Sequence, residues 1–260
     1  MRKEAKAAFS SDQLCDTETV GNERMARDIE VVFLDAGGTL FQVCGSVGQI
    51  YSRFARRYGC ELDRREIDSA FVEAFKTAPP LAFPGIDENE LRRAERLWWK
   101  EIVRKTLMVE MPESALEQFF EEIFEFFKKV EAWHLFPDTR PSLERLRRRG
   151  YRLAIVSNSD SRLDDVLSAL DLNSFFDQVT VSSQAGAAKP NPAIFHKGLQ
   201  AMQVSASRAV HAGDSLEEDF EGARRAGLSA YLVDRQERYQ ERTDGFRVRN
   251  LEELCRTLDS

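Results

Sequence analysis

The fold is decided by the stretch Ile29-Glu30-Val31-Val32-Phe33-Leu34-Asp35-Ala36-Gly37-Gly38-Thr39. Its apolar run stops at an aspartate followed by two glycines within three residues. This pattern is typical of a buried parallel strand that enters a loop at its carboxyl end. We therefore expect residues 29–34 to form the first strand of a parallel sheet.

Four later segments repeat this apolar character, each after a stretch with helical spacing. The expected strands are residues 152–156, 178–182, 209–212 and 230–233, and the expected helices are residues 139–149, 161–170, 192–202 and 216–226. Gly150 and Gly227 stand where a left-handed residue ends a helix. Alternating strands and helices with short loops predict an α/β fold with a doubly wound parallel sheet.

An all-helical insertion is expected between the first strand and the helix at residue 139. Residues 47–58, 63–77, 89–106 and 113–130 have helical spacing, and Asp63 with Glu66 forms a capping box. We interpret the aromatic stripe of residues 116–130 as the core of a helical bundle. The predicted domains are a core of residues 29–45 and 133–260, a helical cap of residues 46–132, and a tail of residues 1–28 outside the fold.

The composition excludes several classes of protein. The chain has 260 residues, 42% of them apolar, and a net charge of −7. Such a charge disfavours binding to nucleic acid, and no uncharged apolar run is long enough to cross a membrane. Four scattered cysteines without metal-ligand spacing, and a polar N-terminus without a signal peptide, predict a cytoplasmic protein.

Polar residues that follow the predicted strands should meet, because ligands bind beyond the carboxyl ends of parallel strands. The candidate site residues are Asp35, Gly37, Thr39, Ser157, Asn158, Lys189, Asp214 and Asp219. This set of carboxylates, hydroxyls and an ammonium group suits phosphoryl transfer.

Each candidate has a predicted role. Asp35 is the catalytic nucleophile, which attacks phosphorus to form an acyl-phosphate, and Lys189 is the second catalytic residue. Mg²⁺ would take oxygen ligands from Asp35, the Gly37 carbonyl and Asp214, with Asp219 nearby as a further metal-site residue that binds directly or through a ligand. Thr39, Ser157, Asn158 and Lys189 would bind a small phosphorylated substrate. Two simpler interpretations stay open, in which Asp35 is a turn residue and Lys189 is a solvated loop lysine.

The four segments, taken in order, resemble the motifs of the haloacid dehalogenase superfamily, in the branch whose helical cap lies between motifs one and two. They are Asp35-Ala36-Gly37-Gly38-Thr39-Leu40-Phe41, Val156-Ser157-Asn158, Lys189-Pro190-Asn191-Pro192 and Gly213-Asp214-Ser215-Leu216-Glu217-Glu218-Asp219. Within the superfamily, Ser46-Val47-Gly48-Gln49-Ile50-Tyr51 is most similar to the HDHD-like, rhythmically-expressed-protein-like group. The resemblance implies a Mg²⁺-dependent phosphatase that works through an aspartyl-phosphate.

One position departs from this pattern. Phosphatases of the superfamily carry a second aspartate two residues after the nucleophile, which protonates the leaving group, and here that position is Gly37. Loss of a general acid typically costs about 10²–10⁴ in rate. A hydrolytic dehalogenase, a phosphonatase-like enzyme and a catalytically impaired binding protein are therefore alternatives. Residues of the cap are where a substitute acid is expected.

Overall fold

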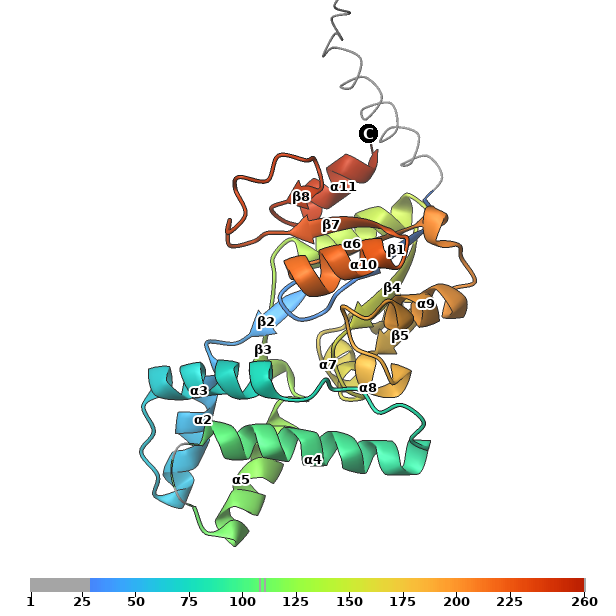
Figure 1. Cartoon of the computed structure of the whole chain (residues 1–260). Coiled ribbons are helices and arrows are strands. Elements are labelled where there is room, and N and C mark those ends of the chain that lie inside the picture. The colour runs from blue at the N-terminus through green and yellow to red at the C-terminus, as the bar shows by residue number, and fades with distance from the viewer. Residues whose placement is uncertain (1–28, 108, 110, 260) are drawn as a thin grey trace, which may run out of the picture.

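A computed structural model describes residues 29–107, 109 and 111–259 of the chain, so the predicted tail lies outside the described residues. The central feature is a six-stranded parallel sheet in the order β5-β4-β1-β6-β7-β8 (Figure 1). Its strands are β1 (Val31–Leu34), β4 (Arg152–Ser157), β5 (Gln178–Val181), β6 (Ala209–Gly213), β7 (Ser229–Val233) and β8 (Arg247–Val248). The predicted doubly wound sheet is confirmed.

Strand β1 is central because its side chains are apolar on both faces. Val32 and Leu34 belong to one buried cluster, whereas Val31 and Phe33 belong to another. Successive side chains of a strand point to opposite faces, so a strand without polar alternation must be covered on both sides. The run of apolar residues therefore places Asp35 at the carboxyl end of a fully buried strand.

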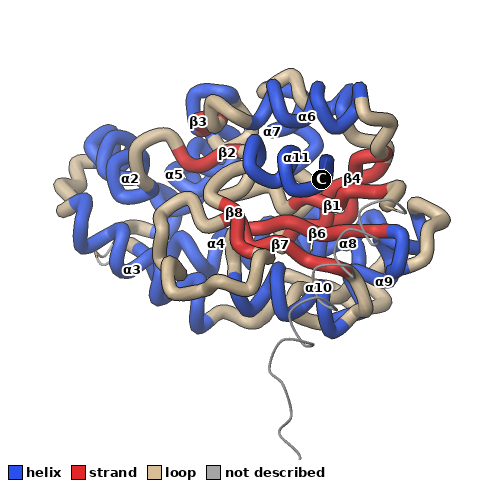
Figure 2. The backbone as a smooth tube through the Cα atoms, turned by 90° about the horizontal axis from the view of Figure 1, so that it is seen from above, coloured by secondary structure: helices blue, strands red, loops and turns tan. Residues whose placement is uncertain are grey.

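Helices cover both faces of this sheet (Figure 2). One face carries α6 (Thr139–Arg148), α7 (Leu163–Ala169) and α11 (Leu251–Asp259), and the other carries α8 (Ser182–Ala185), α9 (Pro192–Ala201) and α10 (Gly222–Arg225). The glycines that follow two of these helices have the predicted positive φ, which is 88° at Gly150 and 86° at Gly227.

Four further helices lie beyond the carboxyl ends of the strands, and we call this group the cap (Figure 1). They are α2 (Val47–Ala55), α3 (Arg64–Thr77), α4 (Glu88–Thr106) and α5 (Glu113–Phe126). Asp63 accepts hydrogen bonds from the backbone N–H groups of Arg65 and Glu66, which caps α3 as predicted. The cap has its own apolar cluster, which includes Phe54, Ile67 and Phe119.

The structure corrects several predicted elements. The helix expected over residues 113–130 ends at Phe126, because the chain turns there toward β3 (Trp133–Leu135), which pairs with β2 (Phe41–Val43). The three short strands β2, β3 and β8 (Arg247–Val248) were not predicted. The helix expected over residues 216–226 is a π-helical segment, Leu216–Glu221, followed by α10. Among the described residues no helix is both long and apolar enough to span a membrane.

Candidate active site

Three strands deliver polar side chains to one cavity of about 370 Å³ between the sheet and the cap. Asp35 directly follows β1, Ser157 ends β4, and Asp214 directly follows β6. The loop after β5 and α8 adds Lys189, and all four residues line the cavity. The convergence expected from the parallel sheet is therefore present.

Lys189 connects two of the predicted carboxylates. Its ammonium donates hydrogen bonds to Asp35 Oδ1 at 2.7 Å and to Asp219 Oδ1 at 2.5 Å. The lysine is 4% exposed, Asp35 is 6% exposed and Asp219 is 1% exposed. Lys189 is thus a buried partner of two acids, which excludes its interpretation as a solvated loop lysine.

Asn158 holds the lysine loop in place. Its amide nitrogen donates to the backbone carbonyl of Lys189 at 2.9 Å, and its amide oxygen accepts from the Lys189 N–H at 2.7 Å. This double contact ties the end of β4 to the loop after β5. Asn158 lines the cavity, and its role in substrate binding stays a prediction.

Asp219 is held by more groups than any other acid of the site. His211 Nε2 lies 2.9 Å from Asp219 Oδ1, and the Ser215 N–H donates to Oδ2 at 3.0 Å. Burial alone would raise the pKa of Asp219, but Lys189 and His211 outweigh it and hold the pKa well below the usual range. Asp219 therefore stays ionised and keeps Lys189 in position.

The ionised forms of the other two acids, Asp35 and Asp214, are unfavourable at this site. Burial raises the pKa of Asp214 to about 7, and the nearby Asp35 and Asp219 add to this rise. Burial likewise raises the pKa of Asp35; Lys189 opposes the rise, and Asp219 adds to it. Three carboxylates thus share the positive charge of Lys189, so a further cation would stabilise their ionised forms.

The carboxylates also meet the geometric requirement for a metal site. One oxygen from each of Asp35, Asp214 and Asp219 lies within 4.8 Å of the others. Oxygen donors in small number suit Mg²⁺, which keeps several of its waters. The residues present therefore fit the predicted ion, with Asp219 less available because both of its oxygens already accept hydrogen bonds.

The two glycines of the first loop differ in what they allow. Gly37 has no positive φ, and a Cβ placed on it would meet nothing within 4 Å. Gly38 has a φ of 79°, and its Cβ would lie 2.5 Å from Asp214 Oδ2. A side chain at Gly38 would collide with Asp214, whereas Gly37 leaves open space two residues after Asp35.

The other predicted residues fall into two groups. Ser157 hydrogen-bonds to the Asp35 carboxylate, which suits its predicted contact with a phosphoryl oxygen. Thr39 is fully buried, and its hydroxyl has no hydrogen-bond partner among the described residues. It is not among the residues that line the cavity, so its predicted role in binding has no support from this geometry.

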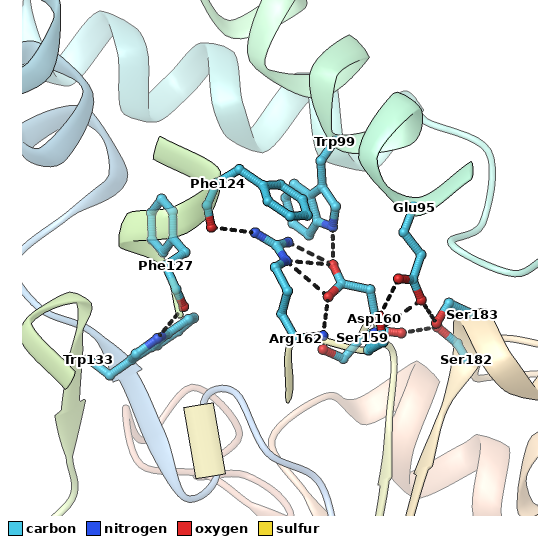
Figure 3. A network of polar contacts seen from close by, with 11 residues as sticks. Glu95, Trp99, Phe124, Phe127, Trp133, Ser159, Asp160, Arg162, Ser182 and Ser183 are labelled. Carbon is cyan, nitrogen blue, oxygen red and sulfur yellow. Dashed lines mark hydrogen bonds and ion pairs between the residues drawn. The ribbon is translucent and has the colours of Figure 1, made fainter. Parts of the chain in front are cut away.

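The sequence did not point to a polar network that joins the cap to the loop after β4 (Figure 3). The Arg162 guanidinium forms an ion pair with Asp160 at 2.7 Å and lies 3.9 Å from the ring centroid of Phe124 on α5. Trp99 of α4 donates its indole N–H to the same Asp160. Asp160 also accepts the backbone N–H of Arg162 at 2.8 Å, which is a local contact of this network.

Comparisons with known proteins agree on the family of the chain. Residues 29–227 match the family model described as haloacid dehalogenase-like hydrolase. The chain is 33% identical over 201 residues to "Haloacid dehalogenase-like hydrolase domain-containing protein 3" of Bos taurus, with 76% of this chain and 79% of that protein covered. It is also 39% identical over 99 residues to a glyceraldehyde 3-phosphate phosphatase of Methanothermobacter thermautotrophicus, covering 38% of this chain and 44% of that protein.

Solved structures include both phosphatases and dehalogenases. The HAD phosphatase from Thermococcus onnurineus has a TM-score of 0.61 and 25% identity, with 88% of this chain and 98% of that chain covered. L-2-haloacid dehalogenase from Xanthobacter autotrophicus has a TM-score of 0.63 at 18% identity, with 89% and 99% covered. The fold is therefore shared by enzymes of both chemistries, and the site has to decide between them.

Proposed function

Because the chain belongs to the haloacid dehalogenase-like hydrolase family, we propose that this hydrolase is a Mg²⁺-dependent phosphatase of small phosphorylated molecules. The observation that carries the proposal is the contact between Asp35 and Lys189 at 2.7 Å, beside Asp214, in one cavity. A buried carboxylate next to a cation suits attack on a phosphoryl group whose oxygens the cation neutralises. The named phosphatases among the relatives support this assignment.

The reaction has two steps, each centred on Asp35. First, a carboxylate oxygen of Asp35 forms a bond to phosphorus, and the bond between phosphorus and the leaving oxygen breaks. Second, water opens the resulting aspartyl-phosphate, which releases inorganic phosphate and restores the carboxylate. The proton that this water gives up balances the proton that the leaving oxygen takes from solvent in the first step. Lys189 neutralises phosphoryl oxygens in both steps, and Ser157 adds a hydrogen bond.

Asp35, Asp214 and the Gly37 carbonyl, with Asp219, would hold the Mg²⁺ ion. When bound, the ion would supply positive charge to the phosphoryl group and to the crowded carboxylates. Gly37 has no side chain, so no acid at that position protonates the leaving group. Among the described residues of the cap, none that lines the cavity is an acid, a lysine or an arginine, and the expected substitute acid is not found there.

Hydrolytic dehalogenation is the second candidate, in which Asp35 attacks carbon instead of phosphorus. Gly37 favours it, because displacement of halide needs no general acid. The cluster of Asp35, Asp214 and Asp219 speaks for the phosphatase, because attack on carbon does not need a cation beside the nucleophile. The same Gly37 supports the third alternative, a catalytically impaired member that binds a ligand.

A panel of phosphomonoesters and 2-haloacids, assayed with Mg²⁺ and with excess chelator, tests the proposal. We expect release of phosphate that the chelator abolishes and Mg²⁺ restores. Asp35→Asn should remove this turnover and keep the thermal melting profile, because the amide is nearly isosteric but not nucleophilic. Release of halide at full rate in chelator would establish the dehalogenase instead, and turnover by Asp35→Asn would exclude the aspartyl-phosphate.

A further inference from the structure

The cavity above Asp35 has two chemically different sides. We call the sheet with the helices on its two faces the sheet domain. All charged residues that line the cavity, such as Asp35, Lys189 and Glu218, belong to the sheet domain and not to the cap. Every described cap residue that lines it is apolar or aromatic, among them Tyr51, Phe71, Phe75, Trp99, Phe120 and Phe124. A leaving group that extends from the phosphoryl group toward the cap therefore lies against rings rather than against charges.

The cation nearest to these rings is already paired. Arg162 lines the cavity, but its guanidinium binds both oxygens of Asp160 and lies over the rings of Phe124 and Trp99, with centroid distances of 3.9 Å and 4.9 Å (Figure 3). Arg162 is also confined, with a side chain 13% exposed. Among the described residues, the cap side thus offers no free cation for a second phosphate or a carboxylate.

The cap side of the cavity is also unfavourable for the hydroxyl groups of a polyol. A hydroxyl that leaves water without a new hydrogen bond costs free energy. The polar atoms that the described cap side chains bring to the cavity are the Trp99 indole N–H, which is already bound to Asp160, and the Tyr51 hydroxyl. Sugar hydroxyls that face the cap would therefore lose their hydrogen bonds to water, because the polar lining residues Asn158, Ser159 and Ser215 lie on the opposite side of the cavity.

Resting on the proposed phosphatase function, we propose that the substrate is a monophosphate ester of an uncharged aromatic alcohol. We call the aromatic cap side of the cavity the wall. A planar ring that lies against the wall gains both apolar burial and contacts with other rings. A cavity of about 370 Å³ is at the small end of the range for ligand pockets, roughly 300–1,000 Å³. This volume suits a single-ring alcohol with its phosphate.

The first test compares benzyl phosphate with glycerol 3-phosphate in the presence of Mg²⁺. Both release primary alcohols, so the comparison separates recognition of the ring from the ease of leaving-group departure. We expect kcat/KM for benzyl phosphate to be higher by about 10- to 100-fold, the value of burying one aromatic ring. An equal or higher kcat/KM for glycerol 3-phosphate would overturn the aromatic substrate and leave the phosphatase standing.

A matched pair of variants on α3 tests the wall itself. Phe75 and Val72 are both exposed, at 41% and 63%, but only Phe75 lines the cavity. Phe75→Ser should reduce the preference for benzyl phosphate by about 3- to 10-fold, while Val72→Ser leaves it unchanged and Phe75→Leu keeps part of it. Equal losses from Phe75→Ser and Val72→Ser would contradict the assigned wall.

Equilibrium binding separates this inference from the proposed function. Calorimetry should show tighter binding of benzylphosphonate than of methylphosphonate, with Mg²⁺ present. If no phosphomonoester is turned over but benzylphosphonate still binds more tightly, the aromatic pocket stands and the phosphatase fails. If both phosphonates bind equally, the aromatic pocket is overturned whatever the activity.

Discussion

Gly37 is the single position that most constrains the chemistry of the site. It lies two residues after Asp35, where the resemblance to phosphatases of the family implies a general acid, yet it has no side chain. A glycine in such a loop can be needed because the backbone has a positive φ. The structure places that requirement at Gly38 instead, with a φ of 79°, and leaves space around Gly37.

We predict that Gly37→Asp raises turnover of alkyl phosphates by up to about 10²–10⁴, because it supplies the missing general acid. Aryl phosphates should gain less, since their leaving groups need little protonation. The measurement is kcat for benzyl and phenyl phosphate in wild type and variant. Gly38→Asp is the matched control and should abolish activity, because its Cβ would lie 2.5 Å from Asp214 Oδ2. A folded Gly37→Asp variant without gain on benzyl phosphate would refute this role.

Lys189 is the residue on which two buried acids depend. Lys189→Met should lower the free energy of unfolding by about 3–5 kcal/mol, because Asp35 and Asp219 would both lose their buried cationic partner. Denaturant titration in the absence of added metal measures this change. Lys76→Met, at an exposed position on α3, should change stability by less than about 0.5 kcal/mol. Equal effects from both variants would contradict the pairing.

At the scale of elements, the conformation of the loop between β7 and β8 depends on the contacts of one acid, Asp234. Asp234 is 4% exposed, accepts the N–H groups of Arg238 and Tyr239, and pairs with Arg247 at 2.7 Å. Burial alone would raise the pKa of Asp234, but Arg247 and these N–H groups hold it below the usual value. Its stabilising effect is therefore present above the unfolded pKa and is lost as pH falls through the folded pKa.

Asp234→Asn should accordingly lower the free energy of unfolding at neutral pH and flatten its decline below about pH 4, the ordinary range of an aspartate. Denaturant titrations at a series of pH values measure both effects. Glu241→Gln, in the same loop and exposed, is the control and should leave the curve unchanged. An Asp234→Asn curve parallel to wild type across the acidic range would exclude this contribution.

The helices and strands also show which parts of the fold a sequence pattern can predict. Long apolar runs and capping residues predicted the main strands and helices, because burial and local hydrogen bonds decide them. Strands β2, β3 and β8 have two or three residues each, too few for a periodic pattern. His211 is fully buried, but its contact with Asp219 depends on tertiary packing, and no local signal indicates it. The same holds for Arg162, which pairs locally with Asp160 but also contacts Trp99 and Phe124 from distant helices.

For the whole molecule, the main question is how the cap is held over the sheet. The paired strands β2 and β3 connect the two covalently, and a buried acid adds a contact far from them. Glu95 on α4 is 2% exposed and accepts hydrogen bonds from the Ser161 N–H at 3.0 Å and from the Ser183 hydroxyl at 2.6 Å. The Ser161 hydroxyl donates to it as well, and Figure 3 shows the contact between Glu95 and Ser183. Because the cavity lies between these two parts, its shape depends on this contact.

We predict that Glu95→Ala weakens the attachment of the cap and thereby impairs binding more than chemistry. It leaves three donors of the sheet domain without their acceptor, and a hydrogen bond to a charged group is worth about 1.5–3 kcal/mol. The free energy of unfolding should fall by at least this amount, and KM should rise while kcat changes less. Glu101→Ala is the control on the same helix, because Glu101 is exposed and, within the part of the chain that the structure describes, pairs only with Lys105 at 3.5 Å. If Glu95→Ala changed kcat alone, or if the two variants behaved alike, the cap would be held by other contacts and Glu95 would have no part in shaping the cavity.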